Sequence, residues 1–290
     1  FGLRRMGNIG VDMFLFLSGI GLWFSWIKTP SARHFFMKRY LRVYPAWLIV
    51  ACFYYIPRFH GGDLMAWIDL IGDITINWDF WLHDELTFWY IPATMLLYCF
   101  APAYMELIRR HPIYRWLVVV MILWCVLVQY VTPIHQVVGH IEIFWSRVPI
   151  FFIGINMGEM VRSKQRIDGT GIWMILIMFV MTLFTSIFLE QSRHGLFPLY
   201  IERMLYIPLT LTTILLLNRV LRRTPRWFNK AFKFVGALSL ECYLIHIHFV
   251  LDHLPKPWGY WLTFFVCLLI TLPAAYLLSK IVNLISKSIE

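Results

Sequence analysis

Apolar residues recur along the chain in long runs that short polar connections separate. The runs lie at about 9–27, 43–59, 88–107, 116–133, 143–161, 171–189, 199–218, 234–251 and 259–283. Most match the roughly 17–25 residues that an α-helix needs to cross the hydrocarbon of a bilayer. The fifth is the weakest, because Arg147, Asn156 and Glu159 interrupt it. The pattern predicts an all-α integral membrane protein, a polytopic bundle with nine transmembrane helices in this sequence.

Composition agrees with this class. Of the 290 residues, 60% are hydrophobic and only 14% are charged. No low-complexity stretch or soluble insertion divides the chain, so we expect one transmembrane domain over residues 1–290. The five cysteines all lie inside apolar runs without CxxC or metal-ligand spacing, which predicts packing roles and no metal site.

The distribution of lysine and arginine along the chain predicts how the protein is oriented in the membrane. A net charge of +10 would favour nucleic acid in a soluble protein, but in a membrane protein the distribution between loops matters more. When the connections are assigned alternately to two sides, most of the 26 lysines and arginines fall on one side. The positive-inside rule makes that side cytoplasmic, with the C-terminal Glu290 inside and residue 1 outside. Since the sequence starts at Phe1 without an export signal, we expect another helix upstream.

The connection at about 60–87 is the longest, and it is predicted to be a structured surface loop outside the membrane. It is rich in aspartate and tryptophan. Aromatic residues at a membrane interface need no further function, whereas carboxylates beside indole rings also suit carbohydrate. Both interpretations stay open.

Ionisable groups inside a span are costly unless they are paired or face a cavity, so each is a candidate for function. Asp12 opens the first run and either caps that helix at the interface or takes part in a site. Arg147 begins the fifth run and either extends to the headgroups or points into the bundle toward a substrate.

The eighth run contains "LSLECYLIHIHFV". Ser239, Tyr243 and His246 follow the i, i+4, i+7 spacing of one helical face, which favours a polar stripe that lines a cavity. Glu241 points toward a different neighbour. His246 and His248 face different ways, which argues against a two-histidine metal site.

The segment "HFFMKRYLRVYPAW" places Lys38, Arg39 and Arg42 at the start of an apolar run. The positive-inside rule alone predicts cations here. Arg39 and Arg42 also lie on one helical face, where two guanidinium groups can bind one phosphate-bearing ligand. The sequence contains no GxSxG, HExxH, P-loop or GxGxxG motif.

Five segments together resemble the acyltransferase 3 family of membrane O-acyltransferases, and they occur in the family's order: "GVDMFLFLSGIGLWFS", "FFMKRYLRVYP", "LTFWYIPATMLLYCFAPAY", "RVPIFFIGI" and "LSLECYLIHIHF". The resemblance implies ten helices in the bacterial cytoplasmic (inner) membrane. It also implies transfer of an acyl group, often acetyl, from cytoplasmic acyl-CoA to a sugar on the outer side.

The resemblance implies roles for particular residues. Arg39 and Arg42 match the family's RxxR pair and would bind the phosphates of CoA, whereas Lys38 would only anchor the helix. The family's presumed catalytic histidine lies on a first helix, which here would be upstream of Phe1. Trp89 and Glu241 are expected to contact the acceptor, and the remaining catalytic candidates are Asp12, Arg147, Ser239, Tyr243 and His246.

Two other functions remain open at this point. A transporter or flippase for an anionic or polyprenyl-linked solute would use similar intramembrane charges, although no internal repeat is evident. A non-catalytic membrane scaffold or receptor would not need two arginines on one face. The acceptor, the acyl chain and the oligomeric state do not follow from the sequence.

Overall fold

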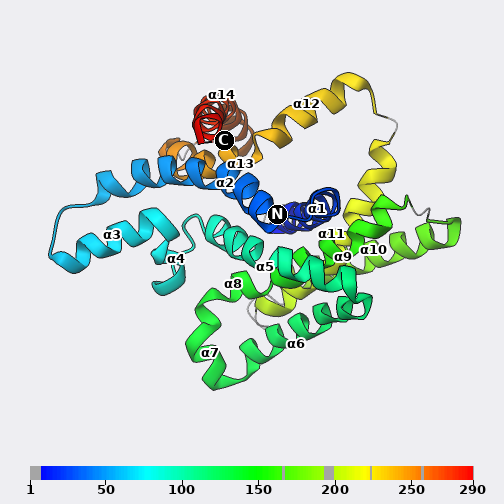
Figure 1. Cartoon of the computed structure of the whole chain (residues 1–290). Coiled ribbons are helices and arrows are strands. Elements are labelled where there is room, and N and C mark those ends of the chain that lie inside the picture. The colour runs from blue at the N-terminus through cyan, green and yellow to red at the C-terminus, as the bar shows by residue number, and fades with distance from the viewer. Residues whose placement is uncertain (1–7, 165–166, 193–198, 223, 256–257, 290) are drawn as a thin grey trace. The chain divides into compact units, whose positions relative to one another are not determined.

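The computed structural model describes residues 8–164, 167–192, 199–222, 224–255 and 258–289 (Figure 1). Helices joined by short connections make up these segments, and no strand occurs among them. The predicted all-α class is therefore confirmed. The chain divides into two compact units, one formed by 1–35 with 96–223 and the other by 36–95 with 224–290.

The first unit contains the first helix, most of the helix that begins at Tyr90, and the helices that follow it up to Leu221. Its elements are α1 (Asn8–Lys28), α5 (Tyr90–Arg110), η3 (Pro112–Trp116), α6 (Leu117–Tyr130), α7 (Thr132–Val138), η4 (Gly139–Ile141), α8 (Glu142–Trp145), α9 (Val148–Arg162), α10 (Gly169–Ser192) and α11 (Leu199–Leu221). The most extensive packing in this unit joins α1 and α9.

The second unit contains most of α2 and the C-terminal helices. Its elements are α2 (Ala32–Tyr55), η2 (Ile56–Arg58), α3 (Leu64–Ile76), α4 (Trp78–Leu82), α12 (Arg226–Ala237), α13 (Ser239–Ile245), the π-helix η5 (His246–Val250), η6 (Leu251–His253) and α14 (Tyr260–Ile289). Hydrogen bonds from both halves of the second unit's sequence hold α2 in place, two of them near its middle. The Tyr40 hydroxyl donates to the Met95 carbonyl at 3.1 Å, and Ser286 Oγ donates to the Leu41 carbonyl at 3.0 Å.

Glycines allow α1 and α9 to approach closely. A Cβ atom on Gly19 would collide with the backbone of Phe151 and lie 2.9 Å from the nitrogen of Ile155. A Cβ atom on Gly154 would collide with the backbone oxygen of Phe16. Small residues at helix contacts are typical of membrane proteins, since lipid provides no hydrophobic drive between helices. The backbones of α1 and α9 therefore touch where these glycines lie.

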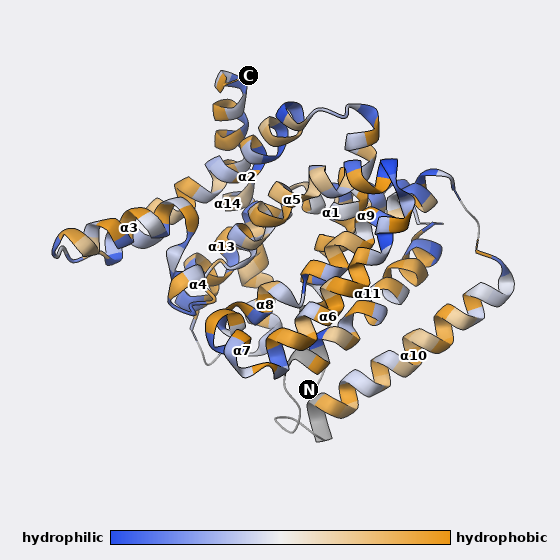
Figure 2. Cartoon of the chain, turned by 60° about the horizontal axis from the view of Figure 1, so that its bottom comes forward, coloured by the Kyte–Doolittle hydropathy of each residue, from blue (hydrophilic) through white to orange (hydrophobic). Residues whose placement is uncertain are grey.

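Several helices keep apolar side chains on their exposed faces. On α10, Trp173, Met174 and Phe184 are exposed, and Figure 2 shows apolar residues along its whole length. An apolar helix with so little protein cover is suited to contact with lipid tails. Among the described residues, six helices are long and apolar enough to cross a membrane, or up to eight if two bent pairs each form one span. The chain is thus a multi-pass membrane protein, and the count of nine spans is not confirmed.

The difference from nine comes from three of the predicted runs. The fifth run is broken by a 44° bend between Thr132–Trp145 and Val148–Arg162, and the eighth by a 54° bend between Arg226–Ala237 and Ser239–His253. The second run lies in α2, whose first half carries Lys38, Arg39 and Arg42. These cations make α2 too charged to qualify as a span by composition.

The connection predicted at 60–87 holds α3 and α4, and hydrogen bonds at both ends define them. Asp63 caps α3 by accepting from the Ala66 amide at 3.0 Å. Asn77 ends α3 in the left-handed region and donates to the Thr87 carbonyl at 2.8 Å. The Asp79 amide donates to Asp73 Oδ1 at 2.9 Å. Asp73 is buried, and this burial together with the nearby Asp79 carboxylate raises its pKa from 3.8 to about 6.

The raised pKa predicts a pH dependence for this segment. Unfolding of the segment exposes Asp73 as an ordinary carboxyl with a pKa of 3.8, so the folded form binds more protons between pH 3.8 and about 6. The stability that Asp73 contributes is full below the lower value and is lost as the pH rises through about 6. In native-state hydrogen exchange of residues 64–82, Asp73→Asn should resemble wild type in acid and open less often than wild type at neutral pH.

Glu85→Gln is the control for this prediction, because Glu85 is exposed in the same connection. It should leave the exchange of residues 64–82 unchanged at every pH. A constant ratio between Asp73→Asn and wild type from acid to neutral pH would contradict the assignment.

Candidate functional site

Arg42 and Glu241 form a paired site between α2 and α13. Arg42 Nη1 donates to Glu241 Oε1, and Arg42 Nη2 donates to Glu241 Oε2 at 3.1 Å. Nη2 also donates to the carbonyl of Ala237 at 2.8 Å. The Glu241 side chain is 0% exposed and that of Arg42 is 39% exposed. Both Glu241 oxygens therefore contact one arginine, in the bidentate geometry that a guanidinium fork favours.

This pairing changes how the two residues are interpreted. Arg42 was predicted to bind phosphate and Glu241 to contact an acceptor. In the structure, the guanidinium nitrogens that would grip a phosphate are directed at Glu241 and Ala237. A buried carboxylate needs such a partner, because an isolated charge in a low-dielectric interior costs several kcal/mol. Arg42 therefore holds α2 to the start of α13.

Arg39 and Lys38 differ from Arg42 and from each other. Arg39 lies one helical turn before Arg42 and is half-buried, and its Nε is buried with no hydrogen-bond acceptor in the described structure. Lys38 is exposed. A buried guanidinium donor without an acceptor is costly, and a ligand with anionic oxygens would satisfy it. Of the three cations, Arg39 is the one with a buried donor that has no acceptor in the described structure.

The predicted polar face of the eighth run is divided by a change of helix type. Ser239 and Tyr243 lie on α13, whereas His246 begins the π-helix η5. Tyr243 Oη accepts from the Tyr90 amide at 3.3 Å, and its ring lies edge-on to that of Tyr90 at 5.3 Å. The ring of the neighbouring Trp89 lies edge-on to that of Tyr90 at 6.1 Å. Single π-helical turns are frequent at functional sites.

His246 has a defined tautomer. Its Nδ1 lies 2.9 Å from the Cys242 carbonyl and 3.1 Å from the Tyr243 carbonyl. Carbonyl oxygens only accept, so Nδ1 carries the proton and Nε2 presents a lone pair. His248 points elsewhere, as predicted, with its ring 4.7 Å from that of Phe88 and 5.2 Å from that of Tyr54. No cluster of three metal-binding side chains occurs among the residues that were placed.

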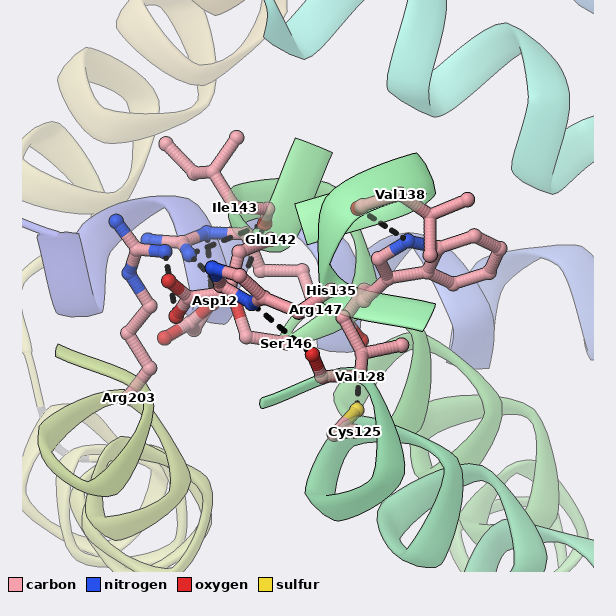
Figure 3. Close-up of polar contacts among 11 residues, drawn as sticks. Asp12, Cys125, Val128, His135, Val138, Glu142, Ile143, Ser146, Arg147 and Arg203 are labelled. Carbon is pink, nitrogen blue, oxygen red and sulfur yellow. Dashed lines mark hydrogen bonds and ion pairs between the residues drawn. The ribbon is translucent and has the colours of Figure 1, made fainter. Parts of the chain in front are cut away.

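In the first unit, Asp12 and Arg147 form a buried ion pair. Arg147 Nε lies 3.5 Å from Asp12 Oδ1. The side chain of Arg147 is 2% exposed and that of Asp12 is 5% exposed. Arg147 Nη1 also donates to the Ile143 carbonyl at 3.2 Å and to Ser146 Oγ at 3.1 Å. Figure 3 shows these side chains directed toward one another. Of the alternatives from the sequence, the inward orientation of Arg147 is the one observed.

A second pair adjoins the first. Arg203 Nη1 on α11 donates to Glu142 Oε1 at 3.0 Å, and both side chains are mostly buried. The four groups thus alternate two carboxylates with two guanidinium groups (Figure 3). Glu142 and Arg203 were not predicted from the sequence. The available signal was their position, since each lies at or next to the N-terminal end of an apolar run, as Asp12 and Arg147 do.

Comparison with known proteins gives one positive result. A profile of the acyltransferase 3 family, described as an acyltransferase domain, matches residues 1–280. The match covers most of both units and every candidate site residue described above. The chain belongs to the acyltransferase 3 family. No curated protein and no solved structure matched it.

Membership in the acyltransferase 3 family confirms the resemblance found in the sequence and makes this chain a membrane acyltransferase. The polar groups described above are therefore candidates for an acyl-transfer site. They fall into two sets, one around Arg39, Arg42, Glu241, Tyr243 and His246 in the second unit and one around Asp12 and Arg147 in the first.

Proposed function

We propose that this acyltransferase moves an acyl group, acetyl in the simplest case, from cytoplasmic acyl-CoA to a hydroxyl group of an extracytoplasmic carbohydrate. We place it in the bacterial cytoplasmic membrane with the C terminus in the cytoplasm. The family supports acyl transfer. The observation that carries the donor assignment is Arg39, whose buried Nε has no acceptor among the residues described.

The phosphates of CoA suit Arg39 by charge and geometry. A guanidinium group binds phosphate oxygens through parallel N–H donors, and it remains charged at any physiological pH. Arg42 acts differently in this proposal. Held by Glu241, it fixes the turn of α2 on which Arg39 lies, and its 39% exposure leaves an edge for a second contact to the same ligand.

The chemical step needs a nucleophile, a proton acceptor and stabilisation of negative charge. The acceptor hydroxyl oxygen attacks the thioester carbonyl, its proton passes to a base, and the C–S bond breaks to release CoA as its thiol. The family resemblance points to a histidine on the family's first helix as that base. Within the described chain, His246 has the suitable tautomer, with the Nε2 lone pair directed away from its own backbone contacts.

The remaining candidates are assigned to binding. Trp89 and Tyr243 are suited to the acceptor, since aromatic rings pack on sugar C–H faces and a phenol donates a hydrogen bond. Ser239 is a further donor on α13.

Arg39→Ala tests the donor assignment. Membranes that contain the full-length protein are given labelled acetyl-CoA and a cell-envelope glycan extract, and label in glycan is measured. Loss of a charged hydrogen bond costs about 1.5–3 kcal/mol, so kcat/KM for acetyl-CoA should fall at least about tenfold. The effect should appear mainly in KM for acetyl-CoA, because the contact is to the non-reacting part of the donor.

Lys38→Ala is the matched control, since Lys38 is the neighbouring cation and is exposed. It should retain normal transfer. Equal kcat/KM in Arg39→Ala and wild type would sink the donor site. Absence of any acyl transfer in wild type, together with movement of an anionic solute across the membrane, would replace the enzyme by a transporter.

A further inference from the structure

Helix α12 has two chemically distinct faces. With 100° between successive residues, Arg226, Lys230 and Lys233 fall together on one side of Arg226–Ala237. The opposite side carries Trp227, Phe228, Ala231, Phe232, Phe234 and Val235. Asn229 and Gly236 lie between the two sets. This arrangement is that of an amphipathic helix at an interface.

The apolar side of α12 has little protein cover. None of its residues is buried, and Trp227 and Phe232 are 71% and 62% exposed. Phe234 has a ring contact outside its own helix, with its centroid 6.1 Å from that of Tyr276 on α14. A soluble protein would not leave three large aromatic side chains in water on one short helix.

The cationic side of α12 has no acidic partner in the part of the chain that the structure describes. Arg226, Lys230 and Lys233 make no ion pair within the described parts of the chain. Arg219, in the last turn of α11, and Arg222, just after that helix, precede them in the sequence, so positive charge accumulates along this stretch. The partner that covers α12 must therefore be apolar on one side and anionic at its edge. A bilayer with anionic headgroups has this combination, and the protein is already embedded in one.

Helix α12 and the segment that follows it do not form one straight helix. The two segments are bent by 54° at Leu238, so α12 departs from the path of the apolar segment that follows it (Figure 1). Cations repeated through α12 on one side would be costly in the hydrocarbon but favourable among headgroups. We propose that α12 is an interfacial helix that binds anionic lipid headgroups through Arg226, Lys230 and Lys233 and inserts its aromatic face among the acyl chains.

Lipid binding by α12 affects the neighbouring ion pair between Arg42 and Glu241. The last residue of α12 is Ala237, whose carbonyl accepts from Arg42. Lipid binding holds the α12–α13 corner in place, and that corner provides both acceptors of Arg42, Ala237 and Glu241. Anionic lipid therefore stabilises the environment of Arg42 from outside the protein.

Hydrogen exchange of the full-length protein in nanodiscs tests the proposal without using its activity. Discs of phosphatidylcholine alone are compared with discs that contain about one third phosphatidylglycerol. Residues 226–237 should exchange more slowly in the anionic discs, whereas α14 should exchange equally in both. Each lysine near an anionic surface adds about a fivefold factor in binding, so Lys230→Gln/Lys233→Gln should lose most of the difference.

Asn229→Gln is the matched control, because it alters the edge of the cationic face without changing its charge. It should keep the wild-type difference between the two lipids. Equal exchange of wild-type α12 in both discs would overturn the proposal. Protection by free coenzyme A in phosphatidylcholine discs, in place of protection by phosphatidylglycerol, would also overturn it, because the cations would then serve a soluble phosphate.

Discussion

Replacement of Arg42 by methionine is expected to destabilise the protein by about 3 kcal/mol, because Glu241 would stay buried without a partner for its charge. Removal of one member of a buried ion pair leaves the full desolvation cost of the other. Methionine keeps the apolar part of the side chain, so the effect reports the lost charge and hydrogen bonds. The measurement is the thermal unfolding of the purified protein in one fixed detergent.

A second substitution separates the charge from the packing. Arg42→Met/Glu241→Leu removes both members of the pair, and replacement of a buried pair by apolar residues is often neutral in stability. The double variant should therefore unfold close to wild type, well above Arg42→Met alone. Lys38→Met serves as the control on the same helix, since Lys38 is exposed, and it should change little.

The same variants distinguish two roles for Arg42. If it only holds α2 to α13, the stable double variant should recover acyl transfer with its stability. If it also contacts CoA, the double variant should fold and bind acetyl-CoA more weakly. Unfolding of Arg42→Met at the wild-type temperature would show that Glu241 does not depend on this partner, and the positioning role would fail.

The fold was largely predictable because lipid-facing helices must be apolar along their whole length. The runs that became α5, α10 and α14 are continuous, and all three qualify as spans. The prediction was less accurate where a run contains a bend or charge. The corner at Leu238 does not interrupt the hydrophobic pattern, and Arg147 only weakens the fifth run, so both bends become visible only as angles between helices.

The buried charged residues of the candidate site could be selected from the sequence, but their contacts could not. The rule that intramembrane charges are functional candidates selected Asp12, Arg147 and Glu241, and each is buried in an ion pair. It did not identify the partners. Arg42 and Glu241 are 199 residues apart, and helical spacing relates only neighbours within one helix. The i, i+3 spacing therefore suggested one shared ligand for Arg39 and Arg42, whereas Arg42 already contacts Glu241.

Gly19→Ala is expected to destabilise the first unit by about 3 kcal/mol or to prevent its folding. The added methyl group would collide with the backbone of Phe151 and press on the amide of Ile155, so no side-chain rotation relieves the contact. The helices must separate, and α1 then loses its closest packing against α9 in a solvent that does not favour re-association. The measurement is the unfolding temperature together with the yield of monodisperse protein.

Gly21→Ala provides a matched control on the same helix. Two residues farther along α1, a Cβ atom meets no other atom within 4 Å, so the same chemical change falls on an open face. Because alanine has the higher helix propensity, Gly21→Ala should be neutral or slightly stabilising. A similar loss in both variants would attribute the effect to helix propensity or membrane insertion. A loss of stability confined to Gly19→Ala would show that the effect arises at the contact between α1 and α9. Asp12 lies on α1 and Arg147 lies at the start of α9, so the same contact brings this ion pair together.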